Sequence, residues 1–264
     1  IAFKDYSPAN GILNSPWVGF KYFTQFFNSV QFGTTMMNTL KISIYSILVG
    51  FPLPILLALL CNQIRTGKFK KVFQVTTYLP HFISTMVMCG MIILFLSPNS
   101  GLIANIFKSL GWTMPNLLSK PESFAGVYVW SDVWQHIGWD SIIYLAALSA
   151  IDPTYYEAAT MDGASRIQKI LNIDLPLLLP TAMILLILRA GSLLSIGFEK
   201  VLLLQNPLNL AGSEVISTYV YKVGMINFQY SYSTAIGLFN TVVNLIILLS
   251  VNWFSKRYTK TGLF

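Results

Sequence analysis

Five polar or aromatic side chains recur at helical spacing within one apolar stretch of this sequence. The stretch covers residues 125–150, and the side chains are Asp132, Gln135, His136, Trp139 and Asp140. Because an α-helix has about 3.6 residues per turn, these positions fall within one arc of a helix. Carboxylates and an imidazole could transfer protons, or could bind the hydroxyl groups of a sugar that stacks on the indole. A polar seam that joins this helix to a partner subunit is the alternative.

Other signatures of enzyme chemistry are absent from the sequence. There are two histidines and two cysteines, and Cys61 and Cys89 lie in apolar stretches without the spacing of a metal site or a disulfide framework. We find no HExxH motif, no nucleophile motif and no phosphate-binding glycine loop. An intramembrane enzyme that uses Asp132, His136 and Asp140 as acid and base is therefore a remote alternative. We expect this chain not to be an enzyme and to bind no metal or cofactor.

Composition indicates a membrane protein. Of the 264 residues, 54% are hydrophobic and only 10% are charged, whereas about 25% are charged in a typical soluble domain. The net charge of +7 does not indicate nucleic-acid binding, because the basic residues form short clusters between apolar stretches. We predict an all-α, polytopic helical bundle that forms one transmembrane domain over residues 1–264.

Five stretches are long and apolar enough to cross a bilayer as helices, which takes roughly 20 residues. They lie at about 39–61, 72–97, 125–150, 175–197 and 233–254. Prolines interrupt three of them: Pro52, Pro54, Pro80, Pro176 and Pro180. We expect kinks at these positions, with the freed backbone groups satisfied by neighbouring helices.

The distribution of basic residues predicts how the spans are oriented. Dense basic residues occur in the loop 62–71, in the loop 151–173 and in the C-terminal tail, as Arg65, Lys68, Lys70, Lys71, Arg166, Lys169, Lys256, Arg257 and Lys260. The positive-inside rule places these segments in the cytoplasm. Residue 1 is then outside, the C-terminus is inside, and we expect one further span before Ile1.

The loop 152–173 is built to contact a partner. Asp152 and Pro153 are typical of a helix start, and Gly163 permits a sharp change of direction before a second short amphipathic piece. The segment resembles the EAA loop of ABC importer permeases. Glu157-Ala158-Ala159, three residues, Gly163, nine residues, Ile173, one residue and Leu175-Pro176 match the pattern at every position.

The resemblance implies a coupling helix that sits in a groove of an ATPase subunit. Contact with the ATPase would come from Glu157, Ala158, Ala159 and Asp162, with the turn at Gly163. As the ATPase dimer closes, the loop would move and the spans would shift between outward and inward access. A solvated surface helix is the alternative for these residues when the rest of the pattern is ignored.

Nearly the whole chain is similar to the maltose-type, oligosaccharide-importing permeases, whose fold is the type I importer fold. Phrases that carry this likeness are Ser15-Pro16-Trp17-Val18-Gly19, Gly197-Phe198-Glu199 and Asn206-Pro207-Leu208-Asn209. The resemblance implies a bacterial plasma-membrane location, a second homologous permease, two ATPase subunits that bind ATP and Mg, an extracytoplasmic solute-binding protein and a sugar substrate. It also implies a solute pathway through His81, Ser84, Asp132, His136, Trp139 and Arg189; Gln135 and Asp140 share the stripe.

Three alternatives remain beside this interpretation. An ABC permease for a solute other than sugar would show the same loop. A secondary transporter would usually show repeats with broken helices at corresponding places, which this sequence lacks. For Arg189, snorkelling to the outer interface is an alternative to a place in the pathway.

Overall fold

Helices account for the regular structure of the computed structural model, which describes residues 1–64, 67–259 and 262. Two of the basic residues used to predict orientation, Arg65 and Lys260, lie outside the described residues. In the described part of the chain, pairing of strand type is limited to one isolated bridge, between Lys4 and Trp17.

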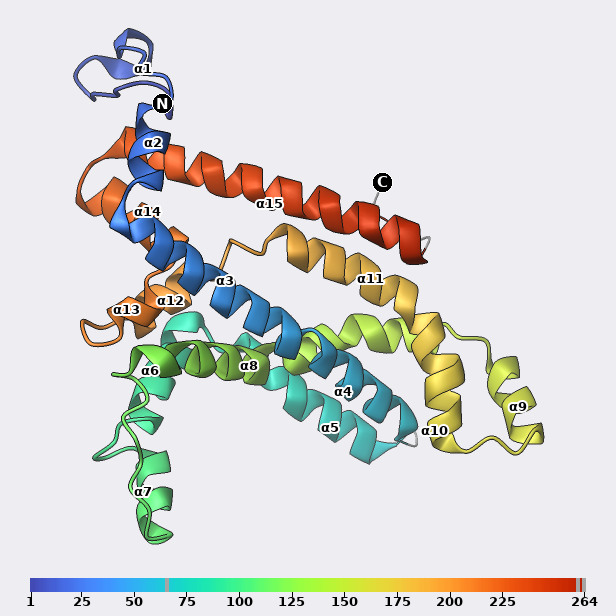
Figure 1. Ribbon diagram of the computed structural model, residues 1–264. Helices are drawn as coiled ribbons and strands as arrows, with labels where there is room; N and C mark the ends of the chain where they lie inside the picture. The colour runs from blue at the N-terminus through green and yellow to red at the C-terminus, as the bar shows by residue number, and fades with distance from the viewer. Residues whose placement is uncertain (65–66, 260–261, 263–264) are drawn as a thin grey trace. The chain divides into compact units, whose positions relative to one another are not determined.

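The elements follow one another along the chain as labelled in Figure 1. In order they are α1 (Gly11–Asn14), α2 (Lys21–Phe27), α3 (Val30–Gly50), α4 (Pro52–Gln63), α5 (Lys68–Tyr78), the 3₁₀ turn η1 (Leu79–Phe82), α6 (Thr85–Phe95), α7 (Leu102–Ser109), α8 (Pro121–Ser149), α9 (Pro153–Met161), α10 (Arg166–Lys169), the π-helical η2 (Ile170–Asp174), α11 (Leu175–Gly191), α12 (Phe198–Leu204), α13 (Leu210–Ser213), α14 (Ile216–Tyr221), the π-helical η3 (Lys222–Ile226) and α15 (Tyr230–Thr259).

Three helical stretches among the described residues are long and apolar enough to cross a membrane: Val30–Gln63, Arg166–Gly191 and Tyr230–Arg257. A fourth arises if the bent pair Lys68–Phe82 and Thr85–Phe95 counts as one span. Helix α8 has 29 residues but is not in this set, because its polar residues lower its mean hydropathy. The helix expected at 175–197 ends at Gly191, and residues 192–197 are not helical.

Two of these stretches are broken where prolines predict it. Pro52 and Pro54 have no N–H, so the carbonyls of Leu48 and Gly50 lose their helical donors, and α3 gives way to α4 at Phe51. Pro80 lies in η1, after which Ile83 is extended and the chain turns by 97° into α6. Each break leaves backbone carbonyls that need partners in an apolar surrounding.

The chain divides into two compact units. Unit 1 comprises Ile1–Tyr45, Thr85–Val129 and Ser192–Ile247. Its core gathers the buried side chains Phe26, Tyr232 and Ile236 around α14 and the start of α15. Polar side chains of α3 support this core, since Asn38 donates to the carbonyls of Ala211 and Glu214, at 3.0 Å each.

Unit 2 comprises Ser46–Ser84, Trp130–Gly191 and Leu248–Phe264. Its core brings α4, α8 and α11 together through the buried residues Ala58, Leu59, Tyr144, Leu148, Leu178 and Ala182. Helices α5 and α8 approach closely at Gly138, where an added Cβ would fall on the carbonyl oxygen of Thr77. A glycine at this crossing lets the two backbones touch, as is common between helices in membranes.

The Gly138 crossing gives the first prediction. Gly138→Ala should destabilise the protein by about 1–3 kcal/mol, because the methyl group has no space between α5 and α8. Gly126→Ala on the same helix is the matched control. Nothing lies within 4 Å of its added Cβ, and we expect a gain of up to about 1 kcal/mol from helix propensity. Thermal unfolding in detergent measures both, and equal shifts for the two variants would contradict the packing described for Gly138.

Candidate functional site

The expected coupling segment folds as helix α9. The Asp152 carboxylate caps its start by accepting from the Thr154 N–H at 2.9 Å, and this bond lowers the pKa of Asp152 below its ordinary value. Pro153 occupies the first turn. The helix ends at Met161, and Gly163 follows with a φ of 73°, in the left-handed region that favours glycine. Ser165 and Gln168 then form a capping box that starts α10.

The residues expected to meet an ATPase lie on the surface of this segment. Glu157, Ala158, Asp162 and Gly163 are exposed, and Ala159 is half-buried. Small side chains beside an exposed carboxylate leave a face on which a partner's groove can pack closely. A second link stabilises the turn, because the Lys169 ammonium donates to the Thr160 hydroxyl at 2.7 Å.

Behind α9, a buried carboxylate joins three elements of unit 2. Asp174 is 0% exposed and lies at the end of η2, where α11 begins. It accepts a short hydrogen bond from the Tyr156 hydroxyl of α9 and a longer one, at 3.4 Å, from the Gln63 amide of α4. Burial and the bond to Asp174 raise the pKa of Tyr156, so its hydroxyl stays protonated as a donor. Movement of α9 is therefore linked directly to the last residue of α4 and to the start of α11.

Sequence reasoning did not select Asp174, Tyr156 or Gln63. Asp174 occupies the one variable position between Ile173 and Leu175. The available signal was a carboxylate at the start of an apolar span, because such residues are costly in a membrane and need named partners.

The polar stripe of α8 is ordered around an aromatic cluster. The His81 ring stacks on Trp139 with centroids 4.3 Å apart and planes 1° apart. Phe82 and His136 meet this stack edge-on, at 5.6 Å from Trp139 and 5.4 Å from His81. The 3₁₀ turn η1 thus carries His81 beside α8. His81, His136 and Trp139, which the sequence predicts for the pathway, lie together.

Asp132 is part of the same arrangement. The His136 Nδ1 atom lies 3.4 Å from the Asp132 carboxylate and 3.1 Å from its backbone carbonyl. The His136 side chain is 34% exposed and that of Asp132 is 40% exposed. Among the described residues, no group of three or more His, Cys, Asp or Glu side chains could hold a metal ion. The arrangement offers stacking faces and hydrogen-bonding groups, which suit a polyhydroxylated solute.

The remaining residues of the predicted pathway have structural partners. Arg189 of α11 forms an ion pair with Asp140 and donates to the carbonyl of Gly50 at 3.1 Å. That carbonyl is the one freed by Pro54. Gln135 is 4% exposed and donates to the carbonyl of Ile83 at 2.8 Å, at the bend. Ser84 is exposed just beyond the bend.

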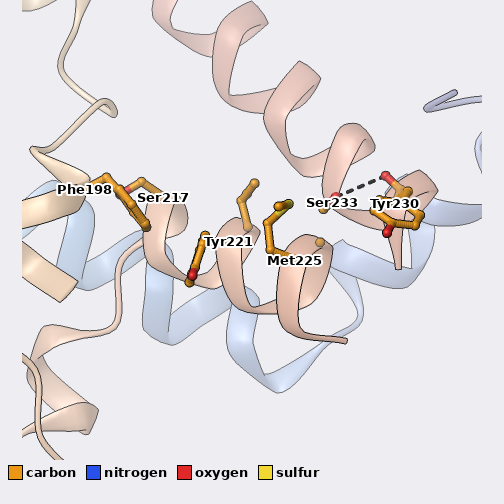
Figure 2. A pocket seen from close by; sticks show the side chains of 8 residues that line it. Phe198, Ser217, Tyr221, Met225, Tyr230 and Ser233 are labelled. Atoms are coloured by element: carbon orange, nitrogen blue, oxygen red, sulfur yellow. Dashed lines mark hydrogen bonds between the residues drawn. The ribbon is translucent and has the colours of Figure 1, made fainter. Parts of the chain in front are cut away.

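Unit 1 carries a separate pocket of about 350 Å³ that none of the predicted residues lines. Figure 2 shows its side chains, which come from α12, α14, η3 and the start of α15. The wall is mostly apolar: Phe198, Ser217, Val220, Tyr221, Gly224, Met225, Tyr230 and Ser233. The Ser233 hydroxyl donates to the carbonyl of Tyr230 at 3.1 Å, so it is already engaged with the helix start.

Comparison with known proteins gives consistent matches. The family described as "Binding-protein-dependent transport system inner membrane component" matches residues 50–260. Protein LplB of Bacillus subtilis (strain 168) is 41% identical over 264 residues, which is 100% of this chain and 83% of that protein. The polygalacturonan/rhamnogalacturonan transport system permease protein YteP of the same strain is 41% identical over 264 residues, or 100% of this chain and 82% of that protein.

A solved structure is similar over almost the same extent. The crystal structure of a bacterial alginate ABC transporter, in complex with an alginate pentasaccharide-bound periplasmic protein, contains a chain that superposes with a TM-score of 0.90. The two chains are 44% identical, and the match covers 93% of this chain and 85% of that one.

The buried Asp174 cluster gives the second prediction. Tyr156→Phe removes one of the donors to a buried carboxylate, so we expect a loss of about 1–3 kcal/mol in the free energy of unfolding. Tyr155→Phe is the matched control, because the neighbouring ring is 56% exposed, and we expect a change within about 0.5 kcal/mol there. Thermal unfolding of the purified protein compares them. Equal stability of the two variants would show that the hydroxyl does not support Asp174.

Proposed function

Because this chain belongs to the family of binding-protein-dependent transport system inner membrane components, we propose that it is the permease subunit of an importer for oligosaccharides. The chain is a multi-pass membrane subunit of an ABC importer and not an enzyme. The observation that carries the proposal is the similarity to a chain of an alginate transporter, at 44% identity and a TM-score of 0.90.

Partners and orientation are part of this proposal. Two ATPase subunits would bind ATP and Mg, a second homologous permease would complete the pathway, and a solute-binding protein would deliver the sugar outside. The relative crystallised with an alginate-loaded periplasmic protein supports the last of these. We place α9, α10 and the C-terminus on the cytoplasmic side, where Lys68, Lys70 and Lys71 also lie by the positive-inside rule.

Coupling would run from α9 through the buried Asp174 into α11. Glu157 and the small residues beside it provide the exposed contact with the ATPase. Tyr156 holds Asp174 at the start of α11, and Arg189 near the end of the same helix pairs with Asp140 of α8. Displacement of α9 would therefore be transmitted through α11 to Asp140, the neighbour of Trp139 in the chain. Both ends of this route lie in unit 2.

Sugar contacts would come from the cluster of His81, Trp139, His136 and Asp132. The Trp139 residue is 42% exposed, although His81 stacks on its indole and Phe82 meets it edge-on, so part of the ring is open to a sugar. The half-buried His136 and Asp132 side chains can exchange hydrogen bonds with hydroxyl groups. Ser84 belongs to this proposed pathway by its exposure beside the bend.

The third prediction tests coupling. In the complete reconstituted importer, Glu157→Lys should reduce sugar-stimulated ATP hydrolysis at least about tenfold, because it reverses the charge at the proposed ATPase contact. Gly163→Pro should do the same, because proline cannot adopt the positive φ of 73° found at this turn.

Each coupling variant has a matched control. Glu122→Lys makes the same charge change in the first turn of α8. Gly111→Pro meets the same backbone conflict, at a φ of 75°. Both controls lie outside the coupling segment. Importer that assembles with either control variant should keep its sugar-stimulated ATP hydrolysis. If hydrolysis and uptake are indifferent to Glu157→Lys and Gly163→Pro, the coupling role of α9 is wrong.

The fourth prediction tests the pathway. Trp139→Leu should lower uptake of a labelled oligosaccharide roughly tenfold, because it removes the stacking surface shared with His81. Trp134→Leu on the same helix is the control, since that ring is similarly exposed, at 50% against 42%. Among the described residues of unit 2, no aromatic ring stacks on it or meets it edge-on. Equal uptake by the two variants would remove Trp139 from the solute pathway.

A further inference from the structure

A polar cavity of about 410 Å³ lies in unit 2 beside helix α9. Its lining comes from the end of α4, from α8, from α9 and from α10: Asn62, Gln63, Leu148, Tyr156, Arg166 and Lys169. Two of these six side chains are cationic and none is a carboxylate. The cavity therefore differs in chemistry from the aromatic stripe of α8, and none of its residues belongs to the proposed sugar pathway.

The two cations of this cavity are not neutralised by carboxylates. Lys169 donates to the neutral hydroxyl of Thr160 at 2.7 Å, which leaves further N–H donors on its ammonium group. Across the part of the chain that the structure describes, the Arg166 guanidinium has no ion pair or side-chain hydrogen bond. The exposed Arg166 and the half-buried Lys169 thus line one cavity, and both have N–H donors available for a ligand.

The buried carboxylate behind the cavity wall does not balance the charge of both cations. Asp174 is completely buried behind the wall, and its oxygens already accept from Tyr156 and Gln63. The same two residues line the cavity, so the carboxylate faces it through their side chains. One negative charge stands against two positive ones. Lys70, close enough to Cys61 at the end of α4 to interact with it electrostatically, adds to the positive potential nearby.

These groups suit a phosphate. A guanidinium presents parallel donors to two phosphate oxygens, an ammonium adds a mobile point charge, and the amides of Asn62 and Gln63 can bond the remaining oxygens. A cytoplasmic surface with clustered basic residues also attracts the anionic headgroups of that leaflet. The volume lies within the range of small-molecule sites, roughly 300–1,000 Å³.

We propose that this cavity binds a phosphate group through Arg166 and Lys169, supplied by an anionic phospholipid headgroup or by a free phosphate compound. The proposal rests on the proposed function in one respect, namely the placement of α9 and α10 at the cytoplasmic face. A bound phosphate would bridge α10 to the end of α4 and to Tyr156 of α9. Occupancy would thereby stiffen the segment through which ATP hydrolysis is coupled to transport.

The test uses the complete importer, without nucleotide, in nanodiscs of phosphatidylcholine, titrated with spin-labelled phosphatidylglycerol. The Arg166→Gln/Lys169→Gln double variant should bind the labelled lipid roughly thirtyfold more weakly than the unchanged protein, since each cation contributes roughly five- to sixfold. Lys256→Gln/Arg257→Gln is the matched control, because it removes the same charge at the cytoplasmic end of α15, outside the cavity. It should retain the affinity of the unchanged protein.

Inorganic phosphate distinguishes the two sources of the ligand. A parallel titration follows binding of radiolabelled phosphate in the neutral nanodiscs. Binding of the lipid alone assigns the cavity to a headgroup, and phosphate binding that Arg166→Gln/Lys169→Gln abolishes assigns it to a free compound. Should the double variant not fold, Arg166→Lys/Lys169→Arg keeps the charge and should keep binding, while the single change Lys169→Gln should weaken it.

Two results would overturn the proposal. One is the absence of saturable binding of either probe, and the other is an equal loss in the Lys256→Gln/Arg257→Gln control. Sugar-stimulated ATP hydrolysis is measured on the same preparation of the unchanged importer. If stimulation is present while neither probe binds, the phosphate site alone is wrong. If stimulation is absent, the failure belongs to the proposed transport function.

Discussion

A backbone N–H or carbonyl inside a bilayer must find a hydrogen-bond partner within the protein, and this constraint organises the helices of this chain. The helical runs break at Phe51, at Ile83 and after Gly191. A polar side chain from another helix is placed at each break. Arg189 donates to the carbonyl of Gly50, and Gln135 donates to that of Ile83. Asn244 of α15 accepts from the N–H of Leu194, just after α11, at 2.9 Å.

Such polar side chains therefore have two possible roles, contact with a solute or support of the fold, and the sequence alone does not distinguish them. A polar residue in an apolar span is expensive, so it marks either a solute pathway or an internal partner. Gln135 is buried and engaged at the bend, so its contribution is to hold the shape of that bend. Arg189 also pairs with Asp140, which neutralises both charges beside Trp139. A pathway lined by compensated charges and aromatic faces suits a solute with many hydroxyl groups.

Within unit 2, the segment that would meet the ATPase and the aromatic stripe are connected by one helix. Helix α11 begins at the buried Asp174 cluster and carries Arg189 close to its end. The prolines divide these stretches into shorter helices: α3 gives way to α4 at Phe51, and the helices before and after Ile83 are bent by 97°. A bundle assembled from such pieces, each secured by a few specific hydrogen bonds, has discrete alternative packings available to it. Alternating access requires a device of this kind.

The sequence by itself determined the class, the long helical stretches and the ends of helix α9. Low charge and long apolar stretches dictate membrane helices, the prolines locate breaks in α3–α4 and near η1, and Asp152, Pro153 and Gly163 specify the ends of α9 through local capping and a left-handed turn. These features depend on neighbouring residues in the chain, so spacing alone reveals them. The number of spans is not decided by composition: the sequence predicts five with residues 125–150, whereas α8 is too polar to be in the set that hydropathy selects among the described helices.

Only the tertiary structure decided which polar residues work together. Tyr156, Gln63 and Asp174 are separated by up to 111 residues and meet at one buried carboxylate. Arg189 and Gly50 are 139 residues apart. His81 of η1 stacks on Trp139 of α8, and Gln135 of the same α8 helix donates to the carbonyl of Ile83, just after η1. Burial, pairing and ring stacking are properties of distant groups brought together, and a periodic pattern along one helix contains no information about its partner.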